Sequence, residues 1–337
     1  MFVITVTYGN RFYLLKEVID AALGEGVHKV IVVDNNSDAE SRNKLKEYES
    51  ILDGKIKVLY LDDNYGSAGG YKKGLEIACN DPECEFIWLL DDDNKPLNGS
   101  LKALLDFWNS LKIEDKKEKV ALLSYRPIRN YLLVESILKN KPELVMCKNS
   151  FLGFHIKNLP TRISMYLKRL LNLKNNEQNE EMNLKYGPVM FAGYGGLFIH
   201  KSILKIIGYP NEKFFLYKDD IEWSYRITKN GGKIYLILDS KINDLELSWT
   251  MSDKKKYTNI HLIFKDKIRF YYSVRNGIYF EINNIVDNKI IYWINMITYL
   301  MLIFLCNREK NFIKIVIKAI KDAYNGNIIK IENKQLK

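Results

Sequence analysis

Three consecutive carboxylates, Asp91, Asp92 and Asp93, directly follow the apolar run of residues 86–90. Neighbouring acids repel one another unless a cation is bound. Alternate residues of an extended segment point the same way, so Asp91 and Asp93 can share one ion. Carboxylate oxygens favour Mg²⁺ or Mn²⁺, and the oxygens of a diphosphate would complete the coordination shell. An acidic triplet alone is usually a solvated turn, but its position after a buried strand favours a divalent-metal site.

Other apolar runs of the chain also end in polar side chains. Asp34 ends the run 30–33, and Asn64 follows the run 56–61. These runs alternate with segments of helical spacing, such as residues 68–79, so we predict right-handed βαβ units and a mostly parallel sheet. Ligands bind beyond the carboxyl ends of the strands in such sheets. We therefore expect these polar residues to meet the Asp triplet at one edge of the sheet.

Residues 64–70, with the sequence Asn-Tyr-Gly-Ser-Ala-Gly-Gly, form a glycine-rich start to the helix predicted for residues 68–79. Backbone amides at such a start can approach an anion, and the helix dipole favours negative charge there. The spacing is neither that of a dinucleotide fingerprint nor that of a P-loop. Taken alone, the pattern is also compatible with a plain strand-to-helix turn.

Five segments, taken in order, resemble glycosyltransferase family 2, which has the GT-A fold. They are residues 3–8, 32–37 and 64–70, the triplet 91–93, and residues 219–223 with Arg226 one helical turn later. The resemblance covers roughly residues 1–280, and the ordered set is specific although each piece alone is not. Residues 64–70 and 219–223 look most like the branch that holds bacterial rhamnosyltransferases and galactofuranosyltransferases. The implied fold is α/β, a Rossmann-like GT-A domain with a mostly parallel sheet and flanking helices.

The resemblance implies an inverting, metal-dependent transfer of a sugar from a nucleotide diphosphate. Asp91 and Asp93 would hold Mn²⁺ or Mg²⁺, and Asp220 would be the general base, with Asp219 and Glu222 supporting it or capping a helix. Such a transfer needs a carboxylate to take the proton of the acceptor hydroxyl and a cation to stabilise the departing diphosphate. The implied nucleotide-sugar-binding residues are Thr7, Arg11, Asp34, Asn64, Gly66, Gly70 and Asp92.

The sequence departs from this branch at one position. A His after the next strand often supplies a further metal ligand there, but residues 240–245 contain none, and Asp244 stands near the expected position. Either Asp244 replaces the His as a metal ligand, or the metal shell is incomplete. We expect Trp223 and Trp249 to line the acceptor site, although a core position is equally compatible with Trp249.

The C-terminal part differs in character. Residues 290–306 are apolar except for Asn295 and Thr298, and they fall just short of the ~20 residues that a spanning helix needs. The helix expected next carries Phe312, Ile315, Val316, Ala319, Ile320 and Ala323 on one face, and Lys310, Lys314, Lys318 and Lys321 on another. This combination predicts association with an anionic membrane surface. The alternative is a helical pair that packs on the protein's own core.

We therefore divide the chain into a GT-A catalytic domain, residues 1–280, and a C-terminal helical, membrane-associating segment, residues 281–337. Within the catalytic domain, residues 1–125 form the nucleotide-sugar-binding half and residues 126–280 the acceptor and catalytic half. The length of the chain alone is enough for one large α/β domain with an appended segment, or for two modest domains.

Composition restricts the partners and the compartment. The net charge of +10 suits a polyanionic partner, but the sequence has no aromatic-basic sheet motif, which argues against nucleic acid. The four cysteines form no CxxC pair and no zinc pattern, so we expect reduced thiols. The first residues lack the features of a signal peptide. We expect a cytoplasmic protein, peripheral on the inner face of the cell membrane.

The resemblance implies a hexosyltransferase that uses a donor of the dTDP-rhamnose or UDP-galactofuranose type. Its acceptor would be a glycan or a lipid-linked oligosaccharide in bacterial cell-surface polysaccharide synthesis. A nucleotidyltransferase is one alternative, but it usually needs a Gly-rich loop that grips a triphosphate, and residues 7–11 offer only Gly9. A catalytically degenerate sugar-nucleotide-binding protein is the other, favoured only by the missing His.

Overall fold

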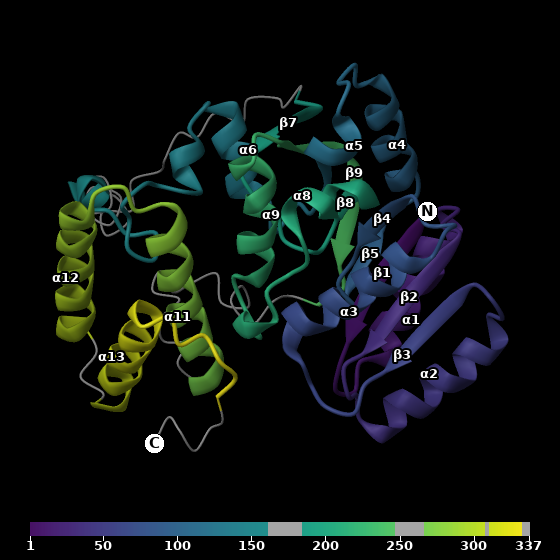
Figure 1. Cartoon of the computed structure of the whole chain (residues 1–337), viewed down its shortest axis with the longest axis horizontal. Helices are drawn as coiled ribbons and strands as arrows, with labels where there is room; N and C mark the ends of the chain where they lie inside the picture. The colour runs from purple at the N-terminus through teal and green to yellow at the C-terminus, as the bar shows by residue number, and fades with distance from the viewer. Residues whose placement is uncertain (161–183, 247–265, 307–309, 332–337) are drawn as a thin grey trace, which may run out of the picture.

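A computed structural model describes residues 1–160, 184–246, 266–306 and 310–331 of the 337-residue chain. An α/β part contains the sheet, and three helices, α11, α12 and α13, stand together on the side away from β1–β3 (Figure 1). Within the described residues, no helix combines the length and the apolar character that crossing a membrane requires.

The N-terminal half of the sheet is parallel, in the order β3-β2-β1-β4. Apolar, largely β-branched runs form these strands, as expected for strands that are covered on both faces. The strands are β1 (Phe2–Thr7), β2 (Lys29–Asp34), β3 (Ile56–Tyr60) and β4 (Phe86–Leu89). The helices that connect them are α1 (Phe12–Gly24), α2 (Ala39–Ile51) and α3 (Gly66–Asn80).

The second half of the sheet mixes directions. β8 (Leu197–His200) runs antiparallel to β4 and to β6 (Val120–Tyr125), and β6 runs parallel to β9 (Lys233–Asp244). The short strands β5 (Asn94–Pro96) and β7 (Tyr186–Val189) pair with β9 in antiparallel fashion. The predicted α/β fold with flanking helices is confirmed, and the antiparallel strands are an addition to the expected pattern.

Several shorter helices lie elsewhere along the chain. The α-helices are α4 (Ser100–Ser110), α5 (Lys116–Lys119), α6 (Tyr131–Leu138), α8 (Leu204–Ile207) and α9 (Asp219–Lys229). The 3₁₀ helices are η1 (Pro142–Leu144), η2 (Ile156–Asn158), η3 (Lys201–Ile203) and η4 (Glu212–Phe214).

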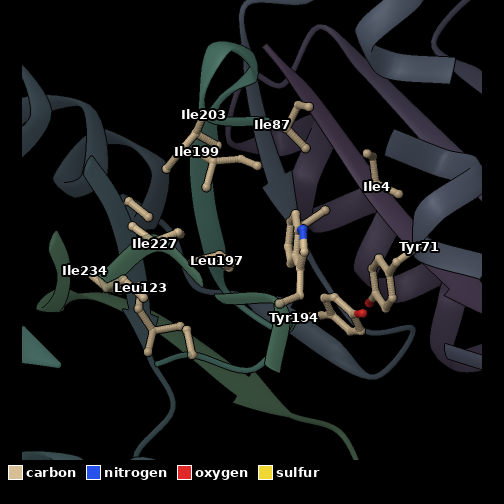
Figure 2. Packing of buried hydrophobic residues seen from close by; sticks show 14 of the residues in the cluster. Ile4, Tyr71, Ile87, Leu123, Tyr194, Leu197, Ile199, Ile203, Ile227 and Ile234 are labelled. Carbon is tan, nitrogen blue, oxygen red and sulfur yellow. The ribbon is translucent and has the colours of Figure 1, made fainter. Parts of the chain in front are cut away.

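Two hydrophobic clusters cover the two faces of the sheet. Successive residues of a strand point to opposite faces, so Ile4 belongs to one cluster and its neighbour Val3 to the other. Figure 2 shows the first cluster, in which the stacked rings of Tyr71 and Tyr194, 4.0 Å apart, lie close to Ile4. With both faces covered, the strand ends are the part of the sheet that remains open to a ligand.

The three C-terminal helices enclose a third cluster, which includes Tyr271, Tyr292, Phe312 and Ile315. They are α11 (Lys267–Asn284), α12 (Lys289–Cys306) and α13 (Lys310–Tyr324). The predicted domain boundary at residue 280 falls inside α11, so that helix belongs to both sides of the proposed division.

The turn between η4 and α9 is strained. Phe215, Tyr217 and Lys218 have φ angles of 64°, 66° and 65°, the left-handed region that costs a non-glycine residue about 1–2 kcal/mol. Such a conformation persists only when the surrounding structure fixes it. This turn leads directly into α9, whose first residues are Asp219 and Asp220.

Asn276 of α11 fixes the strained turn. Its Nδ2 atom lies 2.9, 2.8 and 2.9 Å from the carbonyl oxygens of Phe214, Leu216 and Tyr217. The Asn276 side chain is fully buried, so these carbonyl groups receive their hydrogen bonds away from water. The position of the acids at the start of α9 therefore depends on α11.

We expect Asn276→Ala to lower the free energy of unfolding by about 1–3 kcal/mol, because it removes the buried amide donor that contacts three carbonyl groups of the turn. Amide hydrogen exchange at residues 214–220 should accelerate at the same time. Asn283→Ala is the matched control, since Asn283 lies on the same helix, is exposed, and donates to one carbonyl oxygen, that of Tyr279. Urea denaturation that gives equal losses for both variants would contradict the role of Asn276.

Candidate active site

The Asp triplet and the acids of α9 flank one short glycine segment. A Cβ atom on Gly195 would lie 2.7 Å from Oδ2 of Asp91, and one on Gly193 would lie 3.3 Å from Oδ2 of Asp220. Two residues in a chain are at most ~7 Å apart when they are separated by one other, so Asp91 and Asp220 lie near each other. Burial raises the pKa of Asp220, and the negative charge of Asp91 raises it further.

Asp92, the middle acid of the triplet, points to β1 and α1. Its carboxylate accepts hydrogen bonds from Nε and Nη2 of Arg11, both at 2.9 Å, and from Oγ1 of Thr7 at 2.9 Å. Arg11 also donates to Glu246 at 2.6 Å. The prediction that Asp92 binds the nucleotide sugar stays a prediction, and its carboxylate already positions Thr7 and Arg11.

Asp91 and Asp93 have the properties of a pair that gains from a cation. Burial and the charges of Asp91 and Asp92 raise the pKa of Asp93 to about 7. Tyr71 donates to Oδ1 of Asp91 at 2.9 Å, while the other oxygen of Asp91 and Oδ2 of Asp93 lie 3.4 and 3.6 Å from guanidinium nitrogens. Hard carboxylate oxygens of this kind fit Mg²⁺ or Mn²⁺.

A metal ion at this position would need ligands from elsewhere. In the part of the chain that the structure describes, no three His, Cys, Asp or Glu side chains are grouped closely enough to hold an ion. Two carboxylates with a diphosphate completing the shell remain compatible with that finding.

Asp244 lies at the end of β9 and is engaged by Arg126. Nε of Arg126 donates to Oδ1 of Asp244 at 2.8 Å, and Nη2 makes a second, shorter contact with the same oxygen. Asn94 donates to it as well, at 3.1 Å. The prediction that Asp244 is a metal ligand stays a prediction, and its carboxylate already has a cationic partner.

Sequence reasoning missed Arg126. The residue follows the apolar strand β6, which is the same strand-end position that drew attention to Asp34 and Asp91. Its place at a strand end was the one sequence feature that could have indicated a role. A single Arg at such a place, with no motif around it, looks the same in the sequence as an ordinary surface Arg.

The two adjacent acids of α9 face different surroundings. Asp219 is 2% exposed, and its Oδ2 atom accepts a hydrogen bond from Ser67 at 2.7 Å. Burial and the charge of Asp220 raise the pKa of Asp219 to about 7. Asp220 is half-buried, and its Oδ1 accepts from the backbone amide of Ile221 at 2.8 Å. Asp220 is thus the more accessible of the two acids.

The remaining acid and the tryptophans take different positions. Glu222 pairs with Arg226 through two contacts of 2.9 and 2.6 Å. The structure corrects the expectation for Trp223, which is fully buried and donates to the carbonyl oxygen of Gly208 at 2.8 Å, so it packs in the core and cannot line an acceptor site. Trp249 lies outside the described residues.

Local hydrogen bonds hold the polar residues near the ends of β2 and β3. Asp34 is fully buried and accepts from the amide of Ser37 at 2.8 Å and from Nε of Arg42 at 2.6 Å. Oδ1 of Asn64 accepts from the amide of Gly66 at 2.8 Å. These contacts fix both side chains at the ligand end of the sheet, where a nucleotide was expected.

Gly66 and Gly70 are required by close packing. Gly66 has a φ of 69°, and a Cβ atom there would lie 1.9 Å from the carbonyl oxygen of Phe215. A Cβ atom on Gly70 would lie 2.6 Å from Cγ1 of Val6. The two glycines therefore let α3 approach both β1 and the strained turn, which is a reason for glycine that needs no bound nucleotide.

Comparison with known proteins gives a family match and distant relatives. Residues 2–113 match the model of glycosyl transferase family 2. The low-salt glycan biosynthesis hexosyltransferase Agl10 of Haloferax volcanii is 27% identical over 212 residues, which are 62% of this chain and 56% of Agl10. The dTDP-rhamnosyl transferase RfbF of Shigella flexneri is 21% identical over 82% of this chain and 78% of its own length.

Among solved structures, GalNAc-T7 with UDP, GalNAc and Mn²⁺ aligns with a TM-score of 0.49 and 12% identity, over 72% of this chain and 43% of that one. The chain spans little more than half the length of Agl10. The sequence resemblance is confirmed by the family match and the relatives: this chain is related to glycosyltransferase family 2, and the match to that family lies in residues 2–113.

Proposed function

We propose that this protein is an inverting, metal-dependent glycosyltransferase that moves a sugar from a nucleotide diphosphate to a glycan or lipid-linked acceptor. The observation that carries the proposal is the approach of Asp220 to the Asp91–Asp93 site across the Gly193–Gly195 segment. A base close to a metal and diphosphate site is what a direct displacement at the anomeric carbon needs.

In the proposed reaction, the carboxylate of Asp220 accepts the proton of the acceptor hydroxyl as that oxygen attacks the anomeric carbon. The raised pKa of Asp220 makes it a stronger base than an exposed Asp. Asp219 is bound to Ser67 and keeps the start of α9 against α3. A divalent ion held by Asp91 and Asp93 would supply positive charge beside the departing diphosphate.

The donor side of the proposal rests on the ends of β1, β2 and β3. Thr7, Arg11, Asp34 and Asn64 lie there, the edge at which nucleotides bind in sheets of this type. The similarity to RfbF, a dTDP-rhamnosyl transferase, favours a dTDP-rhamnose-type donor, with a UDP-galactofuranose type as the alternative. A nucleotidyltransferase would release pyrophosphate rather than a nucleoside diphosphate, which gives a direct assay between the two classes.

We also propose that the protein binds the inner face of the membrane through α12. The buried side of this helix carries Tyr292 and Asn295, whereas large apolar side chains are on its exposed side. Those exposed residues are Ile290, Ile291, Trp293, Ile294, Ile297, Met301 and Leu302. Residues 289–321 contain six basic side chains and one acidic side chain. An apolar face with an aromatic residue, in a basic segment of the chain, suits an anionic bilayer surface.

Asp220→Asn should lower kcat by about 10²- to 10⁴-fold, the usual contribution of a general base. Donor affinity should stay nearly unchanged, because the base meets the acceptor rather than the nucleotide. Release of nucleoside diphosphate in the presence of acceptor measures both quantities. Asp219→Asn is the control and should have the smaller effect; a dead Asp219→Asn enzyme beside an active Asp220→Asn enzyme would transfer the role to Asp219.

Asp93→Ala should abolish turnover and leave the thermal unfolding temperature within a few degrees of the parent, since loss of a partly repelled acid does not weaken the fold. Excess EDTA should abolish turnover of the parent enzyme in the same assay, and Mn²⁺ or Mg²⁺ should restore it. Full activity in EDTA would show that the proposed metal dependence is wrong.

Replacing both Ile290 and Ile294 with Glu should reduce binding to vesicles that contain anionic lipid by about tenfold or more, because each isoleucine loses apolar burial and each glutamate adds repulsion. The matched control is Ile51→Glu, since Ile51 is 75% exposed and Ile290 is 73% exposed. Ile51 lies on α2, in the α/β part (Figure 1). Co-sedimentation that gives the same result for all three proteins would argue against α12 as the membrane-binding surface.

A further inference from the structure

The buried guanidinium of Arg126 lies among the acids of the candidate site. The parallel pairing of β6 with β9 shifts its register between Ser124 and Tyr125, immediately before Arg126. Irregularities of this kind re-aim the side chains next to them. Arg126 is 7% exposed, and its three guanidinium nitrogens reach from Asp244 on one side to Asp91 on the other.

The absence of a side chain at Gly195 leaves room for this guanidinium. A Cβ atom on Gly195 would lie 2.3 Å from Nη1 of Arg126, 2.0 Å from Oδ1 of Asn94 and 2.7 Å from Oδ2 of Asp91. Any other residue at position 195 would force these three polar groups apart. Gly195 thus allows the chain to close directly over the contact between Arg126 and the metal-site carboxylate.

The two arginines of the site contact some of its carboxylates more closely than others. Arg11 takes both oxygens of Asp92 at 2.9 Å, and Arg126 takes Asp244 at 2.8 Å and closer. Asp91 and Asp93 are left with longer contacts to the same two arginines. One pair of carboxylates therefore remains to attract a divalent cation, and Asp244 is not one of them.

Arg126 also retains hydrogen-bonding capacity toward a ligand. The contacts that it makes among the described residues use three of the five N–H donors of an arginine side chain. A planar guanidinium matches the geometry of phosphate oxygens and stays charged at any physiological pH. Its position beside Asp91 is next to where a diphosphate would complete the metal shell.

We propose that Arg126 binds the diphosphate of the donor beside the metal ion, and that Asp244 anchors Arg126 rather than serving as a third metal ligand. The proposal rests on the proposed function, because it requires a nucleotide-diphosphate donor. The sequence left two possibilities for the missing His: Asp244 replaces it as a metal ligand, or the protein supplies an incomplete set of ligands. The proposal selects the second. In this arrangement the metal ion has no third protein ligand. The positive charge of Arg126 helps to hold the diphosphate in its place.

The first test measures nucleotide affinity by calorimetry, with UDP, dTDP, uridine and thymidine as the probes and Mn²⁺ present. Arg126→Gln should lower the affinity for the diphosphates by about 10- to 100-fold, which is the usual contribution of a hydrogen bond to a charged group. The nucleosides, which have no phosphate, should keep the parent affinity. Arg126→Lys keeps the positive charge but lacks the planar guanidinium. Its affinity for the diphosphates should lie between those of the parent and Arg126→Gln. An unchanged ratio of diphosphate to nucleoside affinity in Arg126→Gln would overturn the proposal.

The second test measures Mn²⁺ affinity in the presence of UDP or dTDP, from the electron paramagnetic resonance signal of free Mn²⁺. Asp93→Asn should weaken Mn²⁺ binding by about tenfold or more, as loss of a ligand does. The double variant Arg126→Gln/Asp244→Asn should bind Mn²⁺ within about threefold of the parent, allowing for the weaker nucleotide. A loss as large as that of Asp93→Asn, at saturating nucleotide, would identify Asp244 as a metal ligand and overturn the proposal.

The double variant also serves as the folding control. Removing one partner of a buried ion pair leaves the other charge unpaired and destabilises the fold, whereas removing both does not. The weaker diphosphate binding should therefore persist in the double variant with a thermal unfolding temperature close to that of the parent. A parent protein that binds neither nucleosides nor diphosphates would overturn the proposed function itself, an outcome distinct from a change of the ratio.

Discussion

Repulsion among carboxylates at one edge of the sheet is the constraint on which the site depends. Six acids gather there from the ends of β4 and β9 and the start of α9, namely Asp91, Asp92, Asp93, Asp219, Asp220 and Asp244. Arg11 and Arg126 balance two of them through close ion pairs, and burial raises the pKa of Asp93 and Asp219 to about 7. Hydrogen bonds from neighbouring side chains hold most of these acids in place. The negative charge that remains unbalanced would attract a divalent cation, and the cation would in turn attract a diphosphate.

The same edge depends on a segment far away in the sequence. The strained turn before α9 would relax if nothing held it, and Asn276 of α11 holds it through three carbonyl groups. On the opposite side, Gly66 lets the start of α3 approach the same turn, at Phe215. The acids of α9 are therefore positioned by a donor-side helix and a C-terminal helix together. The C-terminal helices support the site directly, which gives a physical reason for α11 to cross the boundary expected at residue 280.

The N-terminal half could be predicted from the sequence, because each strand there is a continuous apolar run and each helix has its own periodic pattern. Asp34 and Asp91 were found in this way. Close approaches between distant segments leave no such pattern. Gly66 packs against Phe215, 149 positions later in the sequence, and Arg126, after β6, pairs with Asp244 at the end of the neighbouring strand β9. Neither contact has a local signal in the sequence. Trp223 was misassigned for a related reason: its place next to the acids is evident in the sequence, but its inward direction is set by the packing of α9.

The orientation of α12 follows from its polar residues. On the buried side, Asn295 donates to the carbonyl oxygen of Asn149 at 2.7 Å and accepts from the amide of Ile156 at 2.9 Å, while Tyr292 donates to Glu281 at 2.9 Å. Turning the helix to bury its isoleucines would break these contacts, and each interior group left without a partner would cost about 1–3 kcal/mol. The polar contacts thus fix the apolar face outward even though water is a poor environment for it. α12 thus buries Asn295 and Tyr292 and exposes Ile290 and Trp293, and under the proposed membrane association the bilayer covers this apolar face.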